Sequence, residues 1–121
     1  MGVWTIDFYE KPNGSSPTKE FLDSLPARER VIVTNAINQL QTHGLALVRP
    51  QVGYLRDHIR ELRVDIGRKR CRILHFIFNR DTFVLLQGFT KRAQDVPDVE
   101  IDRAIEYKRD YESRHTSQQR R

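Results

Sequence analysis

The stretch that decides the fold is residues 59–89, which read IRELRVDIGRKRCRILHFIFNRDTFVLLQGF. Residues 59–66 alternate apolar and charged side chains, and this period of two is typical of a strand with one buried face. Residues 70–78 and 82–89 are rich in aromatic and branched apolar side chains, which predicts two further strands. The two intervening turns are short, so we expect three neighbouring antiparallel strands.

Two helices are expected before this stretch. Residues 3–9 are β-branched and aromatic, and they predict a first strand. Ser16 is a good helix N-cap and Pro17 suits a first helical position, so a short helix is predicted to run to about Leu25. Apolar residues at helical spacing predict a second helix over 27–42, and the two helices are expected to form an N-terminal hairpin.

The remaining segments complete the expected architecture. Residues 45–58 are predicted to be irregular, and a C-terminal helix is predicted from about Pro97, because acidic residues follow it and basic ones come later. Residues 1–114 are expected to form one domain and residues 115–121 a disordered tail. The predicted fold class is α+β, with the order β-α-α-β-β-β-α and a mainly antiparallel sheet.

Composition excludes several classes of protein. The chain has 121 residues, of which 38% are hydrophobic and 31% charged, enough to fold one core. No segment reaches the roughly 18 apolar residues of a membrane span. The first residues carry no pattern of an export signal, and the single Cys71 has no partner for a disulfide or a zinc site. We therefore expect a cytoplasmic protein.

The positive charge is concentrated in one part of the sequence. Residues 54–94 hold 10 basic and 4 acidic side chains, a net charge of +6, whereas residues 1–53 are neutral overall and residues 95–121 carry −1. Such an uneven distribution favours a polyanionic partner, and the alternative is a merely solvated basic face.

Two arginines of the strands are candidates for binding an anion. Arg63 points away from the face of Leu62 and Val64, where it either clamps a phosphate or pairs with a charge on the neighbouring strand. Arg72 stands at the end of an apolar face, where it needs either an ion-pair partner or an anion. Antiparallel pairing is expected to bring Arg72 close to Lys91 and Arg92.

Several short segments carry a family resemblance. They are Glu-Leu-Arg at 61–63, Arg-Ile-Leu at 72–74, Val-Leu-Leu-Gln-Gly-Phe-Thr-Lys-Arg at 84–92, and Pro97 before the last helix. In this order and spacing they resemble the RelE/ParE toxin superfamily, most closely its phage-derived HigB-like branch. The resemblance covers about residues 54–111. The chain departs from the family pattern at Cys71, His75, Gln87 and Arg92; Gln87 replaces a histidine, which removes one candidate for proton transfer.

The resemblance implies a single RelE-like domain and a toxin of a type II toxin–antitoxin system. Such a toxin is expected to be a metal-independent, ribosome-dependent mRNA endoribonuclease that inhibits translation and needs no cofactor. Its expected partners are mRNA, the ribosome and a cognate helix-turn-helix antitoxin, and oligomers are expected only through the antitoxin complex. A non-catalytic, ParE-like gyrase inhibitor and a basic RNA-binding prophage protein remain as alternatives.

Metal-independent RNA cleavage needs a proton acceptor, a proton donor and cations that stabilise the extra negative charge of the phosphorane. The chain shows no metal-ligand spacing and no paired histidines. Glu61 is expected to orient Arg63 or Arg72, and a role as the general base is the alternative. The predicted catalytic residues are Arg63, Arg72, Lys91 and Arg92. The predicted RNA-binding residues are Tyr54, His58, Arg60, Arg68, Lys69 and Arg70.

Overall fold

The structure is a computed structural model that describes residues 4–92 and 94–119. In this part of the chain, five strands and three α-helices are joined by short loops and one 3-10 helix, Gly44–Ala46. The order is β1 (Thr5–Phe8), α1 (Pro17–Ser24), α2 (Ala27–His43), β2 (Val52–Tyr54), β3 (Arg60–Ile66), β4 (Lys69–Phe78), β5 (Thr82–Lys91) and α3 (Asp98–Gln119).

The strands form one sheet in the order β1-β5-β4-β3-β2. β2, β3, β4 and β5 are antiparallel to their neighbours, and only β1 runs parallel to its partner β5. The predicted α+β class and the three antiparallel neighbours of residues 59–89 are therefore confirmed. β4 lies at the centre, which agrees with the apolar side chains on both of its faces.

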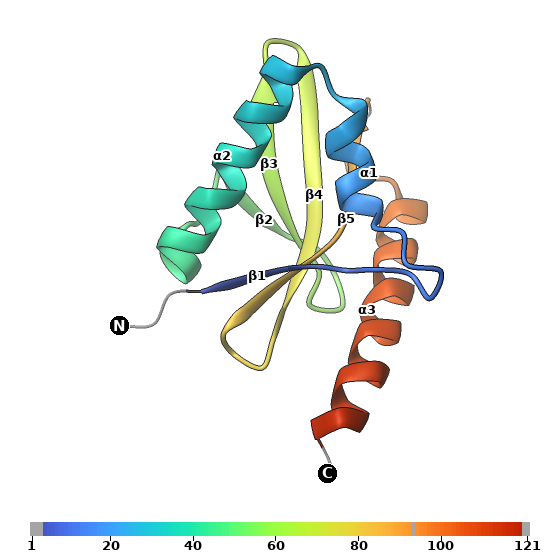
Figure 1. Ribbon diagram of the computed structural model, residues 1–121. Coiled ribbons are helices and arrows are strands. Elements are labelled where there is room, and N and C mark those ends of the chain that lie inside the picture. The colour runs from blue at the N-terminus through green and yellow to red at the C-terminus, as the bar shows by residue number, and fades with distance from the viewer. Residues whose placement is uncertain (1–3, 93, 120–121) are drawn as a thin grey trace.

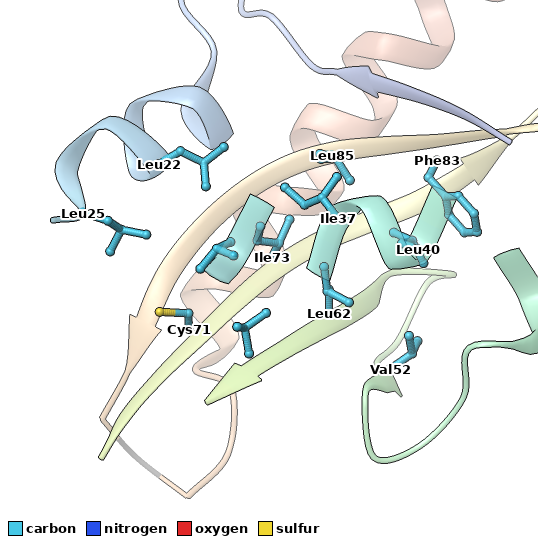
Figure 2. Close-up of a cluster of buried hydrophobic side chains, with 12 residues drawn as sticks. Leu22, Leu25, Ile37, Leu40, Val52, Leu62, Cys71, Ile73, Phe83 and Leu85 are labelled. Carbon is cyan, nitrogen blue, oxygen red and sulfur yellow. The ribbon is translucent and has the colours of Figure 1, made fainter. Parts of the chain in front are cut away.

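Helices cover both faces of this sheet (Figure 1). α1 and α2 pack on one face, where Ile37 and Leu40 of α2 lie over Leu62 and Ile73 of the sheet (Figure 2). α3 packs on the opposite face through Ile101, Ala104 and Ile105, which meet the other side of β4 and β5. The sequence indicated a core on one side of the central strand, but the structure has a core on each side.

The predicted irregular segment 45–58 requires a correction, because it contains the edge strand β2. Val52 of β2 is completely buried and pairs with Leu62, and Tyr54 pairs with Arg60. A strand of three residues is too short for an alternating pattern to be visible. The nearby Pro50 and Gly53 also favoured an irregular loop.

Two other boundaries differ from the prediction. α3 continues to Gln119, so residues 115–119 of the predicted disordered tail are helical, and residues 120–121 lie outside the described part. The ring of His115 stacks on that of Tyr111 at a centroid distance of 3.8 Å, within the helix. β5 ends at Lys91 rather than Phe89, so Lys91 belongs to the sheet and not to the loop after it. The division into one domain and a tail, the RelE-like character of the fold and the N-terminal hairpin stay predictions.

Two tyrosine–aspartate hydrogen bonds attach α3 to the first strand. Tyr9 Oη donates to Asp110 Oδ2 at 2.7 Å, and Tyr111 Oη donates to Asp7 Oδ2 at 2.6 Å. Burial and the adjacent Asp110 raise the pKa of Tyr9 to about 12, and burial and Asp7 likewise raise the pKa of Tyr111. Both hydroxyls therefore stay protonated and remain donors at neutral pH.

Removing either hydroxyl should loosen this attachment. We expect Tyr9→Phe and Tyr111→Phe each to lower the free energy of unfolding by about 1.5–3 kcal/mol, the usual contribution of a hydrogen bond to a charged group. Urea denaturation measures the change. Tyr54→Phe is the matched control, because Tyr54 is half exposed, and losses no larger than that of the control would contradict the prediction.

Candidate functional site

Strand register gathers four of the predicted cationic residues on one face of the sheet. Arg63 of β3 lies directly opposite Arg72 of β4, and Arg70 lies opposite both Asp65 on one side and Lys91 on the other. Paired residues share a face, so these side chains leave the sheet on the same side, which is also the side of α3. Like charges directly opposite each other repel, so Arg63 and Arg72 need carboxylates between them.

Arg72 is held by two carboxylates and a backbone oxygen. Its side chain is 5% exposed, and Nη1 donates to Asp65 Oδ1 at 2.7 Å and to the carbonyl oxygen of Cys71 at 2.9 Å. Its Nε lies 3.3 Å from Glu61 Oε1, an ion pair that lacks the alignment of a hydrogen bond. The structure therefore places Arg72 in a buried ion-pair network beneath the surface.

Arg63 belongs to the same network but reaches the solvent. Its Nη2 lies 3.2 Å from Glu61 Oε2, and a third of its side chain is exposed. The network lies against Gly53 of β2, where a Cβ atom would come within 2.6 Å of Arg63 Nη2 and 2.7 Å of Glu61 Oε2. Glycine at this position leaves room for the pair. Glu61 thus contacts both arginines, whereas the sequence predicted that it orients one or the other.

Further cations line a groove next to this network, at the turn between β3 and β4. The groove encloses about 790 Å³. We call it the basic groove, and it is lined by Asp65, Gly67, Arg68, Lys69, Arg70, Thr90, Lys91, Arg92 and Gln94. Lys91 Nζ donates to the carbonyl oxygen of Gln94 at 2.8 Å, while Lys69 Nζ is paired with Glu29 at 2.6 Å. The structure thus brings five of the predicted cations to one groove, with Arg63 and Arg72 inward of it on the sheet.

The histidines lie away from the basic groove. His75 is completely buried on the other face, and burial lowers its pKa to about 4, so it is neutral at physiological pH. Gln87, at the position where the family pattern has a histidine, donates to the backbone oxygen and to Oε1 of Glu100 and so fixes the start of α3. Asp65, Lys69 and Lys91 line the groove and Glu61 lies next to it, and the chemistry of these groups allows proton transfer.

The described residues include no group of three or more histidine, cysteine, aspartate or glutamate side chains suited to a metal ion. They also include no helix that is long and apolar enough to cross a bilayer.

The other three predicted RNA-binding residues gather elsewhere. Tyr54, His58 and Arg60 line a separate pocket at the opposite end of β3, together with Lys108 of α3. The structure therefore divides the predicted binding residues between two places rather than one.

Sequence reasoning missed three residues that shape these sites. Asp65 holds Arg72, Gln94 holds Lys91 through its backbone, and Lys108 comes to the second pocket from a distant helix. The sequence did contain a signal for Asp65, because this residue comes two positions after Arg63 and therefore lies on the same face of β3. Lys108 had none, because the position of α3 on the sheet depends on tertiary packing.

Comparison with models of known families shows which family the chain belongs to. The model of the family Phage derived protein Gp49-like (DUF891) matches residues 20–109, well over half of the chain. The chain belongs to this phage-derived Gp49-like family. The matched part of the Gp49-like protein contains the Arg63–Glu61–Arg72 network, the basic groove and the lining of the second pocket except Glu112. No curated protein matches the Gp49-like chain.

Proposed function

We propose that this protein is the toxin of a type II toxin–antitoxin system and that it cuts mRNA on the ribosome without a metal ion. The observation that carries the proposal is the cationic face of the sheet. Arg63, Arg70 and Lys91 lie on it, beside a groove of about 790 Å³ that five cationic side chains line. Membership of a phage-derived family and the resemblance to HigB-like toxins support the same function.

The proposed reaction uses the RNA's own 2′-hydroxyl. This oxygen loses its proton and attacks the adjacent phosphorus, and the bond to the 5′-oxygen breaks as that oxygen gains a proton. The products are a 2′,3′-cyclic phosphate and a 5′-hydroxyl. The step adds negative charge to the non-bridging oxygens of the phosphate, and fixed cations that stabilise this charge accelerate the reaction.

Each residue of the network has a different proposed role. Arg63 is the partly exposed guanidinium that contacts the phosphate, and Glu61 and Arg72 are positioning residues that hold it from below. Lys91 is the candidate for proton transfer, because its Nζ lies at the groove surface. Arg68, Arg70 and Arg92 attract the RNA backbone. The proposed antitoxin silences the toxin by binding it.

Charge-removing variants test this site. We expect Arg63→Gln and Lys91→Gln each to slow RNA cleavage by about 10²–10³-fold, the usual effect of removing one stabilising group from a transition state. Inducible expression followed by mapping of transcript ends measures cleavage in cells, and purified protein with translating ribosomes and EDTA tests metal independence. Arg80→Gln is the matched control, because Arg80 is exposed in the β4–β5 turn, at the other end of β4.

Three outcomes would contradict the proposal. Folded Arg63→Gln and Lys91→Gln variants that still cut RNA at the wild-type rate would refute the site. Growth arrest with intact transcripts and a DNA-damage response would indicate a gyrase inhibitor. RNA binding without cleavage or growth arrest would indicate a binding module. The toxin function would be supported if a helix-turn-helix protein encoded by the adjacent gene relieves the growth arrest.

A further inference from the structure

A second pocket lies at the opposite end of β3 from the basic groove. It encloses about 570 Å³, and we call it the Arg60 pocket. Its walls come from β2, the β2–β3 loop, β3, β4 and α3, and include Tyr54, His58, Arg60, Ile77, Lys108 and Glu112. A volume of this size lies within the range of pockets that bind small molecules, which is about 300–1,000 Å³.

Arg60 lines this pocket, and its side chain is nearly buried without an ion pair to any residue that the structure describes. Arg60 is only 9% exposed, and its Nε has no hydrogen-bond partner. None of the ion pairs found within residues 4–92 and 94–119 includes it. Burying an unpaired charge is strongly unfavourable, and buried charges are normally paired. A buried cation that lines an open pocket therefore indicates an anionic ligand.

The surroundings of Arg60 do not compensate its charge. Its guanidinium lies between two aromatic rings, 5.0 Å from the centroid of Tyr54 and 5.9 Å from that of Phe83. Cation–π contacts of this kind hold the side chain in place but leave its hydrogen-bond donors free. His75, its partner across β3 and β4, is buried and neutral, and its Nε2 also lacks a hydrogen bond. Nε of Arg60 is enclosed, but its two Nη atoms make no hydrogen bond to any described residue, so these donors remain available to a ligand.

The other walls favour a nucleotide over a simple carboxylate. Tyr54 is 48% exposed at the mouth of the pocket, and Arg49 lies 5.6 Å from its ring centroid. Glu112 is paired with Lys108 at 3.2 Å, so this carboxylate does not neutralise the charge of Arg60. Aromatic rings and guanidinium planes stack on bases, and guanidinium groups bind phosphate through paired hydrogen bonds. An acidic side chain would fill little of the volume and would not use the ring.

We propose that the Arg60 pocket is a second phosphate-binding site, which holds the phosphate of one nucleotide on Arg60 with its base against Tyr54. The ligand class rests on the proposed function, since an RNA-cutting protein meets nucleotides. Arg60 and Arg63 leave β3 on opposite faces and are three residues apart, roughly 10 Å along the strand. One phosphate cannot contact both, so the site is separate from the basic groove.

Titration of the full chain with adenosine 5′-monophosphate, followed by amide NMR and calorimetry, tests the proposal. We expect shifts at residues 54–60 and an affinity that falls by about tenfold or more in Arg60→Met, as expected for losing hydrogen bonds to a charged group. Tyr54→Ala, at the surface, should weaken binding by about fivefold or more through lost stacking. Arg28→Gln, which removes one exposed charge on α2, should bind like the wild type.

Thermal stability gives a second readout. Removing a buried unpaired charge should raise the unfolding midpoint of Arg60→Met above that of the ligand-free wild type. A lower midpoint together with unchanged nucleotide binding would show that Arg60 is a structural residue and would overturn the proposal. Absence of shifts at residues 54–60 would also overturn it.

Further probes identify what the pocket recognises. Inorganic phosphate should compete with the nucleotide, whereas adenosine that binds as tightly as the nucleotide would refute the phosphate site. An acidic peptide that binds where the nucleotide does not would assign the pocket to a protein partner and overturn the proposal. Competition by a short RNA would support a nucleotide within an RNA strand as the occupant of the pocket. Binding of the mononucleotide without competition by RNA would support a free mononucleotide as the occupant.

Failure of this proposal is distinguishable from failure of the proposed function. Arg63→Gln should lose RNA cleavage but still bind the mononucleotide. A protein that binds the nucleotide at Arg60 but cuts no RNA would refute only the proposed function. A protein that cuts RNA but shows no nucleotide at Arg60 would refute only the pocket.

Discussion

Replacing Arg72 by methionine should lower the free energy of unfolding by about 3–5 kcal/mol, the usual cost of breaking a buried ion pair. Methionine fits the space of the side chain but leaves Glu61 buried with only one arginine, and Asp65 without a partner. Urea denaturation by circular dichroism measures the loss. Arg72→Met should therefore lose RNA cleavage partly through its fold, which is why Arg63 and Lys91 are the better probes of chemistry.

A double-mutant cycle measures the interaction energy between Glu61 and Arg72 separately from their other contacts. Glu61→Leu alone should also be strongly destabilising, because it leaves Arg72 buried with only the exposed Asp65. The double variant Glu61→Leu with Arg72→Met should cost less than the sum of the two single changes, because neither buried charge is then left behind. Single changes that cost less than about 1 kcal/mol, a value typical of surface ion pairs, would show that solvent screens this network.

Acid should destabilise the protein through His75. Burial lowers its pKa to about 4, from 6.5 in the unfolded chain, so between these values the unfolded state binds a proton that the folded state does not. The contribution of His75 to the free energy of unfolding is therefore constant above pH 6.5 and falls progressively as the pH decreases towards 4. The full effect is about 3 kcal/mol, since each unit of pKa shift corresponds to about 1.4 kcal/mol.

Substitution isolates this contribution. His75→Phe should be almost as stable as the wild type at pH 7 and about 2–3 kcal/mol more stable at pH 4.5, measured by urea denaturation at both values. His43→Gln is the matched control, because it removes an exposed imidazole at the end of α2. The hydrogen bond from Tyr9 lowers the pKa of Asp110, which places the acid sensitivity of that carboxylate below the His75 range. Equal pH dependence in His75→Phe and the wild type would exclude His75 as the source.

The chemistry of the site was partly visible in the sequence. Alternation along residues 59–66 placed Arg63 and Glu61 on one face, and antiparallel order placed the start of β4 beside the end of β5. These inferences depend on local periodicity and on short turns, which act over a few residues. The same information did not show whether Arg72 faces an anion or a carboxylate, because that depends on how deeply the strand is buried.

The alternating strands, the two early helices and the concentration of positive charge in residues 54–94 were determined by the sequence alone, because they depend on neighbouring side chains. The edge strand β2, the extension of β5 to Lys91 and the second core under α3 were decided only by tertiary packing. Packing also brought Lys108 to the pocket that Arg60 lines and left that arginine without an ion pair to any described residue, because the residues that surround a buried charge come from segments far apart in the chain.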